Sequence, residues 1–182
     1  MKIKIVVFLF FLVPSISSFS QKMISKTGHI SFFSKTPMEN IEAHNRQVVS
    51  ILDIGTGDIM FNLLIKSFEF KNALMQEHFN ENYLESDKIP KATFKGTITN
   101  FSKIDFKKDG TYSAEISGTI TIHGVPKQLN TTADIEVKGG VINAKSKFQL
   151  TPKDFDIKIP SLVEEKIAKQ MDVSVELTYN PY

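Results

Sequence analysis

The sequence predicts an all-β fold of about eight or nine antiparallel strands with one or two short helices. Apolar and polar residues alternate with a period of two over several segments, as half-buried strands require. Glycine-containing turns separate several of these segments, and helical periodicity is scarce. Because each strand must bury its apolar face, the strands either stack as a sandwich or close into a barrel.

The first 20 residues have the three parts of a secretory signal peptide. Two lysines give a positive start, residues 5–13 form an unbroken apolar run, and Ser18 and Ser20 are small residues suited to cleavage after Ser20. A membrane-spanning helix needs about 20 apolar residues, so this run is too short to be one. We therefore expect an exported protein, periplasmic or secreted, with residues 21–182 as its one domain and no membrane span after cleavage.

Each expected strand shows the alternation in its own residues. Between residues 112 and 122, for example, Ile116 and Ile120 lie on one face while Ser117 and Thr119 lie on the other. The sequences Gly55-Thr56-Gly57-Asp58 and Gly139-Gly140 are hairpin signals, because glycine adopts positive φ without strain. The expected strands begin near residue 30 and then cover residues 48–54, 59–70, 93–99, 112–122, 133–137, 142–150, 155–159 and 173–179.

Two segments favour short helices. Residues 72–84 place Leu74, Met75 and Phe79 near helical spacing. Residues 161–170 begin with Ser161, and Glu164 follows three positions later, as in a capping box.

Composition excludes several classes of function. The chain has no cysteine, so it forms no disulfide, thiolate metal site or cysteine nucleophile. Removing the first 20 residues takes two lysines and no acidic residue, which leaves 20 charges of each sign. A neutral chain whose only arginine is Arg46 argues against binding to nucleic acid.

Motifs for catalysis are missing from the sequence. None of the four histidines belongs to a zinc-binding HExxH motif, and there is no GxSxG nucleophile elbow or glycine-rich phosphate loop. We therefore expect no enzyme, no cofactor and no metal site. The rival hypothesis of an enzyme would rest on His78 with Glu81 and Glu85, or on His123.

Three segments together resemble the YceI family of exported, lipocalin-like proteins. They are HFNENYLESDKIPKATFKG at residues 78–96, GTITIHGVPKQL at 118–129 and DFDIKIP at 154–160. Their order and spacing match over nearly the whole chain after residue 20. In the last segment the glycine that the family carries after Asp-Phe is replaced by Asp156.

The resemblance implies a single antiparallel eight-stranded lipocalin-like barrel, whose lumen holds a long apolar lipid such as a polyprenol or an isoprenoid quinone. It implies a non-catalytic binding protein. A barrel of this size is just wide enough to be filled by side chains or to hold one small ligand. The small inward residues, Gly96 and Gly118 among them, either leave room in the lumen or mark tight packing.

The inward faces of the strands supply the candidate ligand-binding residues. Two polar residues, Tyr112 and His123, are candidate anchors for a ligand. The apolar candidates for the lumen are Phe61, Leu63, Phe94, Ile98, Ile116, Ile120, Phe148 and Val175.

The alternative is a solid barrel that acts as a protein-interaction or stress-associated module without a ligand. Met60 and Leu64 on the outer surface, or the helix around Met75, would then contact a partner. A homodimer formed through an edge or a loop would use the same residues.

Overall fold

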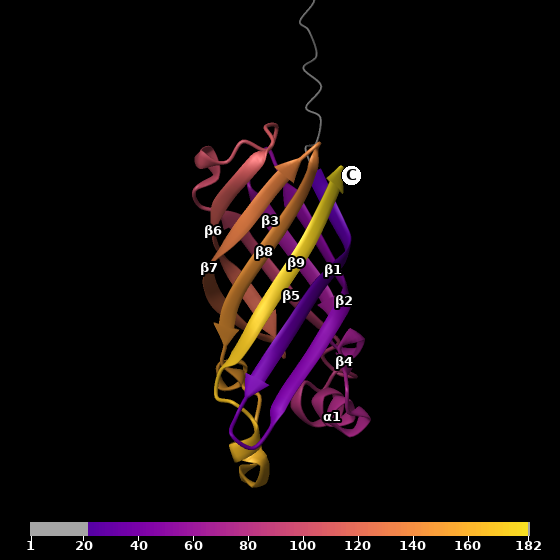
Figure 1. Cartoon of the computed structure of the whole chain (residues 1–182). Helices are drawn as coiled ribbons and strands as arrows, with labels where there is room; N and C mark the ends of the chain where they lie inside the picture. The colour runs from indigo at the N-terminus through magenta and orange to yellow at the C-terminus, as the bar shows by residue number, and fades with distance from the viewer. Residues whose placement is uncertain (1–21, 182) are drawn as a thin grey trace, which may run out of the picture.

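The computed structural model describes residues 22–181, which form a closed antiparallel barrel of eight strands (Figure 1). Around the wall the strand order is β1-β9-β8-β7-β6-β5-β3-β2, and β2 pairs again with β1 to close the sheet. A ninth strand, β4, pairs with β2 outside this closed order. The bounds are β1 Lys22–Lys35, β2 Asn40–Asp53, β3 Asp58–Leu64, β4 Glu69–Phe70, β5 Lys91–Ile98, β6 Gly110–Ile122, β7 Val125–Lys138, β8 Val141–Leu150 and β9 Met171–Pro181.

The predicted fold class is confirmed, and the structure decides for a barrel over a sandwich. Both hairpin predictions are confirmed as well: β2 and β3 are joined through Gly57, and β7 and β8 through Gly139 and Gly140, all three with positive φ. β1 pairs with β2 along one side and with β9 along the other, so β1 has no open edge.

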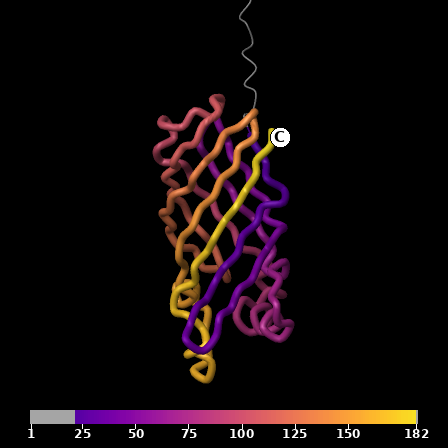
Figure 2. The backbone as a smooth tube through the Cα atoms, in the orientation of Figure 1, coloured from indigo at the N-terminus to yellow at the C-terminus, as the bar shows by residue number. Residues whose placement is uncertain are grey.

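The two long connections of the barrel lie at the same end, as Figure 2 shows. The first connection, residues 65–90, contains the 3-10 turn η1 (Ile65–Ser67), β4, the helix α1 (Ala73–His78) and the π turn η2 (Phe79–Tyr83). The second connection, residues 151–170, contains the 3-10 helices η4 (Pro152–Phe155) and η5 (Ser161–Lys166). We call this the mouth end, and the opposite end the packed end.

The helix predicted at residues 72–84 is present as α1 and η2. The carboxamide of Asn72 accepts hydrogen bonds from the backbone N–H groups of Leu74 and Met75, which caps the amino end of α1. The predicted strand at residues 59–70 ends early, at Leu64. There the buried Asn45 donates from Nδ2 to the carbonyl of Leu64 at 2.9 Å, where the chain turns out of the wall.

Two predictions for the second connection are wrong. Residues 155–159 form no strand, because Asp156 adopts a left-handed φ of 55° after η4 and breaks the extended path. Residues 161–170 form only the short 3-10 helix η5, and its N-cap is Pro160, which has no side-chain cap bond. The backbone N–H of Ala168 then donates to Ser34 Oγ at 2.8 Å, which holds the chain against β1 soon after this helix ends.

The two halves of the barrel interior differ in packing. In the half toward the packed end, inward side chains such as Leu52, Ile135 and Ile142 are at most 3% exposed. In the half toward the mouth, inward residues such as Ile120 and Phe148 are only half-buried. The half-buried state of these apolar side chains indicates that the barrel is hollow there.

Two facing glycines accommodate an aromatic ring between these halves. Gly96 and Gly118 are paired across β5 and β6, and a Cβ at either position would lie within 2.7 Å of the Phe94 ring. A Cβ on Gly118 would also collide with the carbonyl oxygen of Lys95. These glycines therefore mark tight packing of Phe94 against the wall rather than free space in the lumen.

One buried hydrogen-bonded pair fastens the packed half. Tyr179 Oη lies 2.7 Å from Ser50 Oγ, and the same Ser50 hydroxyl lies 3.0 Å from the carbonyl oxygen of Met60. Tyr179 is 2% exposed, and its burial raises the pKa of its hydroxyl well above the usual value.

The raised pKa of Tyr179 predicts alkaline destabilisation. In the unfolded chain the tyrosine ionises near pH 10, whereas the folded protein keeps it neutral, so stability is lost as pH rises above about 10. The variant Tyr179→Phe should cost about 1 kcal/mol at neutral pH and should lose less stability above pH 10 than the wild type. Urea unfolding followed from about pH 8 to about pH 11 measures both effects.

The matched control is Tyr112→Phe, since the Tyr112 hydroxyl donates to the carbonyl of Lys108 on an exposed stretch. This control should keep the alkaline loss of the wild type. Equal alkaline profiles for wild type and Tyr179→Phe would contradict the assignment to Tyr179.

Candidate functional site: an apolar cavity at the mouth of the barrel

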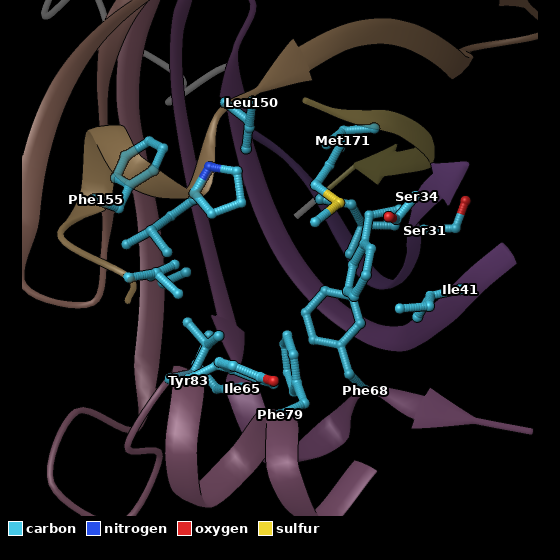
Figure 3. Close-up of a pocket in the computed structure, with 18 of the residues that line it drawn as sticks. Ser31, Ser34, Ile41, Ile65, Phe68, Phe79, Tyr83, Leu150, Phe155 and Met171 are labelled. Carbon is cyan, nitrogen blue, oxygen red and sulfur yellow. The ribbon is translucent and has the colours of Figure 1, made fainter. Parts of the chain in front are cut away.

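A cavity of about 490 Å³ occupies the mouth half of the barrel. Its volume falls in the range of about 300–1,000 Å³ that is typical of small-molecule sites. Figure 3 shows that its walls come from strands and from both connections, with Phe68, Phe79 and Tyr83 on one side and Leu150 and Phe155 on another. The barrel is therefore not solid in this half, and the role in protein interaction stays a prediction.

Seven of the ten residues that the sequence singled out line this cavity. They come from β3, β5, β6, β8 and β9, so the alternation within each strand placed them correctly on the inner face. Their part in holding a ligand stays a prediction. The seven are Phe61, Leu63, Phe94, Ile116, Ile120, Phe148 and Val175.

The other three lie elsewhere among the described residues. Ile98 faces a separate void of about 50 Å³ deeper in the barrel. Tyr112 lies near the start of β6, toward the packed end, and His123 lies in the turn between β6 and β7 at the mouth end. Neither of these two polar residues lines the cavity.

The deeper void lies next to the cavity, toward the packed half. Both spaces share lining residues, among them Phe61, Ile116 and Val175. Phe61 meets Phe94 edge-on with ring centroids 6.2 Å apart, and these two rings form part of the cavity floor. The cavity is therefore closed at its inner end by packed side chains, with a small apolar void beyond them.

A cluster of four phenylalanines forms one wall of the mouth, and sequence analysis missed all four as lining residues: Phe32, Phe68, Phe70 and Phe79. Phe79 packs against each of the other three rings with centroid distances between 5.0 and 5.6 Å. The fourth ring, Phe32, belongs to β1 and ties the first connection to the barrel wall. The density of phenylalanine at residues 68–79 was the available signal, but these rings follow no strand alternation.

The second connection supplies the opposite wall. Phe155, Ile157 and Ile159 line the cavity, as do Val163 and Ile167. The apolar residues at 155, 157 and 159 had suggested a strand. Their alternation instead turns apolar side chains toward the cavity from an irregular segment.

The buried polar groups on the cavity wall have partners. Ser34 Oγ accepts a hydrogen bond from Ala168, and Thr131 and Ser146 lie 3.3 Å apart through their hydroxyl oxygens. Within residues 22–181, no buried side-chain polar atom lacks a hydrogen-bond partner. The wall thus leaves no buried polar side chain to be satisfied by a ligand, so it favours an apolar occupant.

The opening of the cavity lies between the two connections. Three ionisable residues of the lining, Glu39, His78 and Lys166, belong to the β1–β2 turn, α1 and η5. His78 and Lys166 are exposed, and Glu39 is half-buried. Leu74 also lines the cavity and is 56% exposed. Polar atoms of a ligand would reach water here, while its apolar part would lie deeper.

His123 joins the two connections at the mouth, although it does not line the cavity. Its Nδ1 lies 3.1 Å from the carbonyl oxygen of Phe155, in the second connection. Its Nε2 lies 3.3 Å from Glu85 Oε2, in the first connection. The hydrogen bond from Lys88, followed by the one from His123, holds the pKa of Glu85 below its usual value.

The structure also places the residues on which the enzyme and protein-interaction hypotheses rest. Glu85 bonds to Lys88 and His123, with His78 at the end of α1 on the cavity mouth. Met60 and Leu64 face outward, 49% and 46% exposed, whereas Met75 lines the cavity.

Two searches of the described part of the chain, for metal sites and for membrane helices, give negative results. Residues 22–181 contain no cluster of three or more histidine or acidic side chains arranged to hold a metal ion. Nor does any helix in that part have the length and apolar character needed to cross a membrane.

Comparison with known proteins identifies the family. The model of the YceI-like domain matches residues 15–179. A search of curated proteins finds no match. Three similar solved structures share the fold at low sequence identity.

The first is a polyisoprenoid binding domain from Saccharophagus degradans implicated in plant cell wall breakdown. It has a TM-score of 0.77 at 13% identity, covering 89% of this chain and 99% of its own. The second, BcnA of Burkholderia cenocepacia, has a TM-score of 0.70 at 14% identity over 83% and 95% of the two chains. The third, the YCEI protein of Campylobacter jejuni, has a TM-score of 0.59 at 18% identity over 77% and 84%. The structure is a barrel closed between β1 and β2, and two long connections form walls of its apolar cavity. Because the family model matches most of the sequence, the chain belongs to the YceI-like domain family.

Proposed function

We propose that this protein is a non-catalytic binding protein that holds a long apolar lipid of isoprenoid type in the cavity of its barrel. The observation that carries the proposal is the 490 Å³ apolar cavity, open at one end and blind at the other. The similarity to a polyisoprenoid binding domain supports the same class of ligand. Polyprenols and isoprenoid quinones both belong to this class.

The free energy of binding would come mainly from burial of the chain. Each methylene transferred from water into an apolar site contributes about 0.8 kcal/mol. A wall made of phenylalanine, isoleucine and valine side chains selects for an apolar chain but offers few directional contacts. The protein would therefore recognise the shape and apolarity of a chain more than its polar group.

The orientation of the ligand follows from the two ends of the cavity. The inner end, beyond Phe61 and Phe94, is apolar, so the chain terminus would lie there. The polar group would lie at the mouth, near Glu39, His78 and Lys166, where it keeps its hydration.

Native mass spectrometry of protein purified from an export-competent host tests the proposal directly. We expect a one-to-one adduct that is removed by organic solvent, and the extracted mass identifies the lipid. If the host supplies no such lipid, the protein should take up added polyprenol or ubiquinone. Failure to bind either compound would contradict the proposed function.

A variant that fills the cavity should weaken binding. In Ile120→Trp the larger indole takes up space that the chain needs, so we expect at least a ten-fold loss of affinity, equivalent to about 1.4 kcal/mol. Titration with a fluorescent polyprenol analogue measures this loss.

Thr119→Trp is the matched control, because Thr119 precedes Ile120 on β6 and is exposed on the outer face. It should bind like the wild type. Thermal unfolding confirms that both variants are folded, and equal affinities for the two would exclude the cavity as the binding site.

We also propose that the protein is exported and cleaved after Ser20. The signal-like segment lies outside the described residues, so this proposal rests on the sequence alone. Intact-mass analysis of protein from an exporting host should show a chain that begins at Gln21. The variant Ser20→Lys, which places a long charged side chain at the cleavage position, should remain unprocessed. A mature wild-type protein that retains residues 1–20 would contradict cleavage.

A further inference from the structure

The turn between β6 and β7 lies between the two connections that wall the mouth. It consists of His123 and Gly124, with φ values of 52° and 75°. Positive φ at both central residues defines a type I′ turn, which favours asparagine followed by glycine because asparagine tolerates the left-handed region well. A histidine here carries backbone strain that the turn itself does not require.

Strained residues converge on this turn. Within residues 22–181, the non-glycine residues with positive φ are Glu85, His123 and Asp156. Glu85 bonds to the His123 ring, and Asp156 directly follows Phe155, whose carbonyl oxygen accepts from the same ring. Strained backbone persists where the surrounding contacts enforce it, so the three positions act together.

Whether both hydrogen bonds can form depends on the protonation of the ring. A carbonyl oxygen and a carboxylate oxygen only accept, so each ring nitrogen must carry a hydrogen to bond to its partner. Neutral imidazole has one N–H and therefore satisfies one of the two partners. Both bonds form together only in the imidazolium ion.

The geometry points to His123 as a positioning residue that fastens the two mouth segments together when its ring is protonated, and thereby slows release of the bound lipid. This inference rests on the proposed function. The first connection contributes Phe79, Tyr83 and Leu84 to the cavity wall, and the second contributes Pro152 and Phe155. Loss of one bond lets the two walls move apart and widens the exit.

The charged groups around the ring are compatible with this role. From the first connection, Glu85 faces the ring, and Lys88 pairs with the other oxygen of the same carboxylate at 2.6 Å. From the second connection the Phe155 carbonyl faces the ring, with Asp154 and Asp156 next to it in sequence. The His123 side chain is only 14% exposed, so water competes weakly for its two bonds.

The dissociation rate of an uncharged probe tests the inference. Diphenylhexatriene is apolar, fluoresces in apolar surroundings and has no titratable group, so pH acts only on the protein. Histidine changes charge between about pH 5 and pH 8. We expect release into excess cyclodextrin to be about three- to ten-fold faster at pH 8 than at pH 5.5, as the loss of one hydrogen bond predicts.

Two variants make opposite predictions. His123→Asn suits the type I′ turn and should fold, but it removes the ring, so release should be fast at both pH values. In Glu85→Gln the side-chain amide can donate to a neutral Nε2 or accept from a protonated one, so release should be slow at both pH values. His44→Asn, at a histidine of β2 that does not line the cavity, is the matched control and should keep the wild-type pH profile.

Hydrogen exchange of the ligand-free protein provides a second measurement. After correction for intrinsic rates, the backbone amides of residues 85–90 and 152–157 should exchange faster at pH 8 than at pH 5.5 in the wild type. The difference should vanish in Glu85→Gln.

The outcomes separate the two proposals. A protein that binds neither diphenylhexatriene nor a polyprenol would overturn the proposed function, and the exchange data would still decide whether His123 fastens the mouth. Release with the same pH profile in the wild type and His123→Asn, or with no pH dependence in the wild type, would overturn the role of His123 in retention while lipid binding stands.

Discussion

Closure of the sheet at β1 is the constraint on which the rest of the molecule depends. Because β1 pairs with β2 along one side and β9 along the other, the wall is continuous and every strand directs alternate side chains inward. At the packed end the β2–β3 and β7–β8 turns are tight and β5 is joined to β6 by residues 99–109, whereas the two longest connections emerge at the other end. The position of the cavity follows from this arrangement.

Packing then divides the interior into a rigid half and a hollow half. In the rigid half, large side chains and the Ser50–Tyr179 pair fill the barrel. At the boundary between the halves, Gly96 and Gly118 have no side chain, so the Phe94 ring packs directly against the barrel wall. This ring therefore forms part of the inner end of the cavity. In the hollow half, the inward apolar side chains have no opposing layer of side chains to pack against, so a cavity remains. The aromatic cluster around Phe79 closes one side of this cavity.

The strands were predictable from the sequence, because a period of two is a local pattern that the barrel preserves. The same pattern placed Ile116 and Phe148 on the inner face. The walls of the mouth were not predictable in this way, since Phe68 lies after a 3-10 turn and Phe79 at the end of a short helix, and neither follows the strand alternation. One signal was available for the second connection: the family has glycine where this chain has Asp156, and the backbone there is left-handed. The orientation of His123 depends on contacts with Glu85 and Phe155, which lie far away along the chain and which local alternation does not encode.

The ends of the described chain also have a practical consequence. Met23 pairs with Pro181 across β1 and β9, so both ends lie at the packed end, far along the barrel from the mouth (Figure 1). A dye, an affinity tag or a surface linker fused after the last strand would therefore stay clear of the entrance. Molecules immobilised in this way would all present the mouth of the barrel to solution.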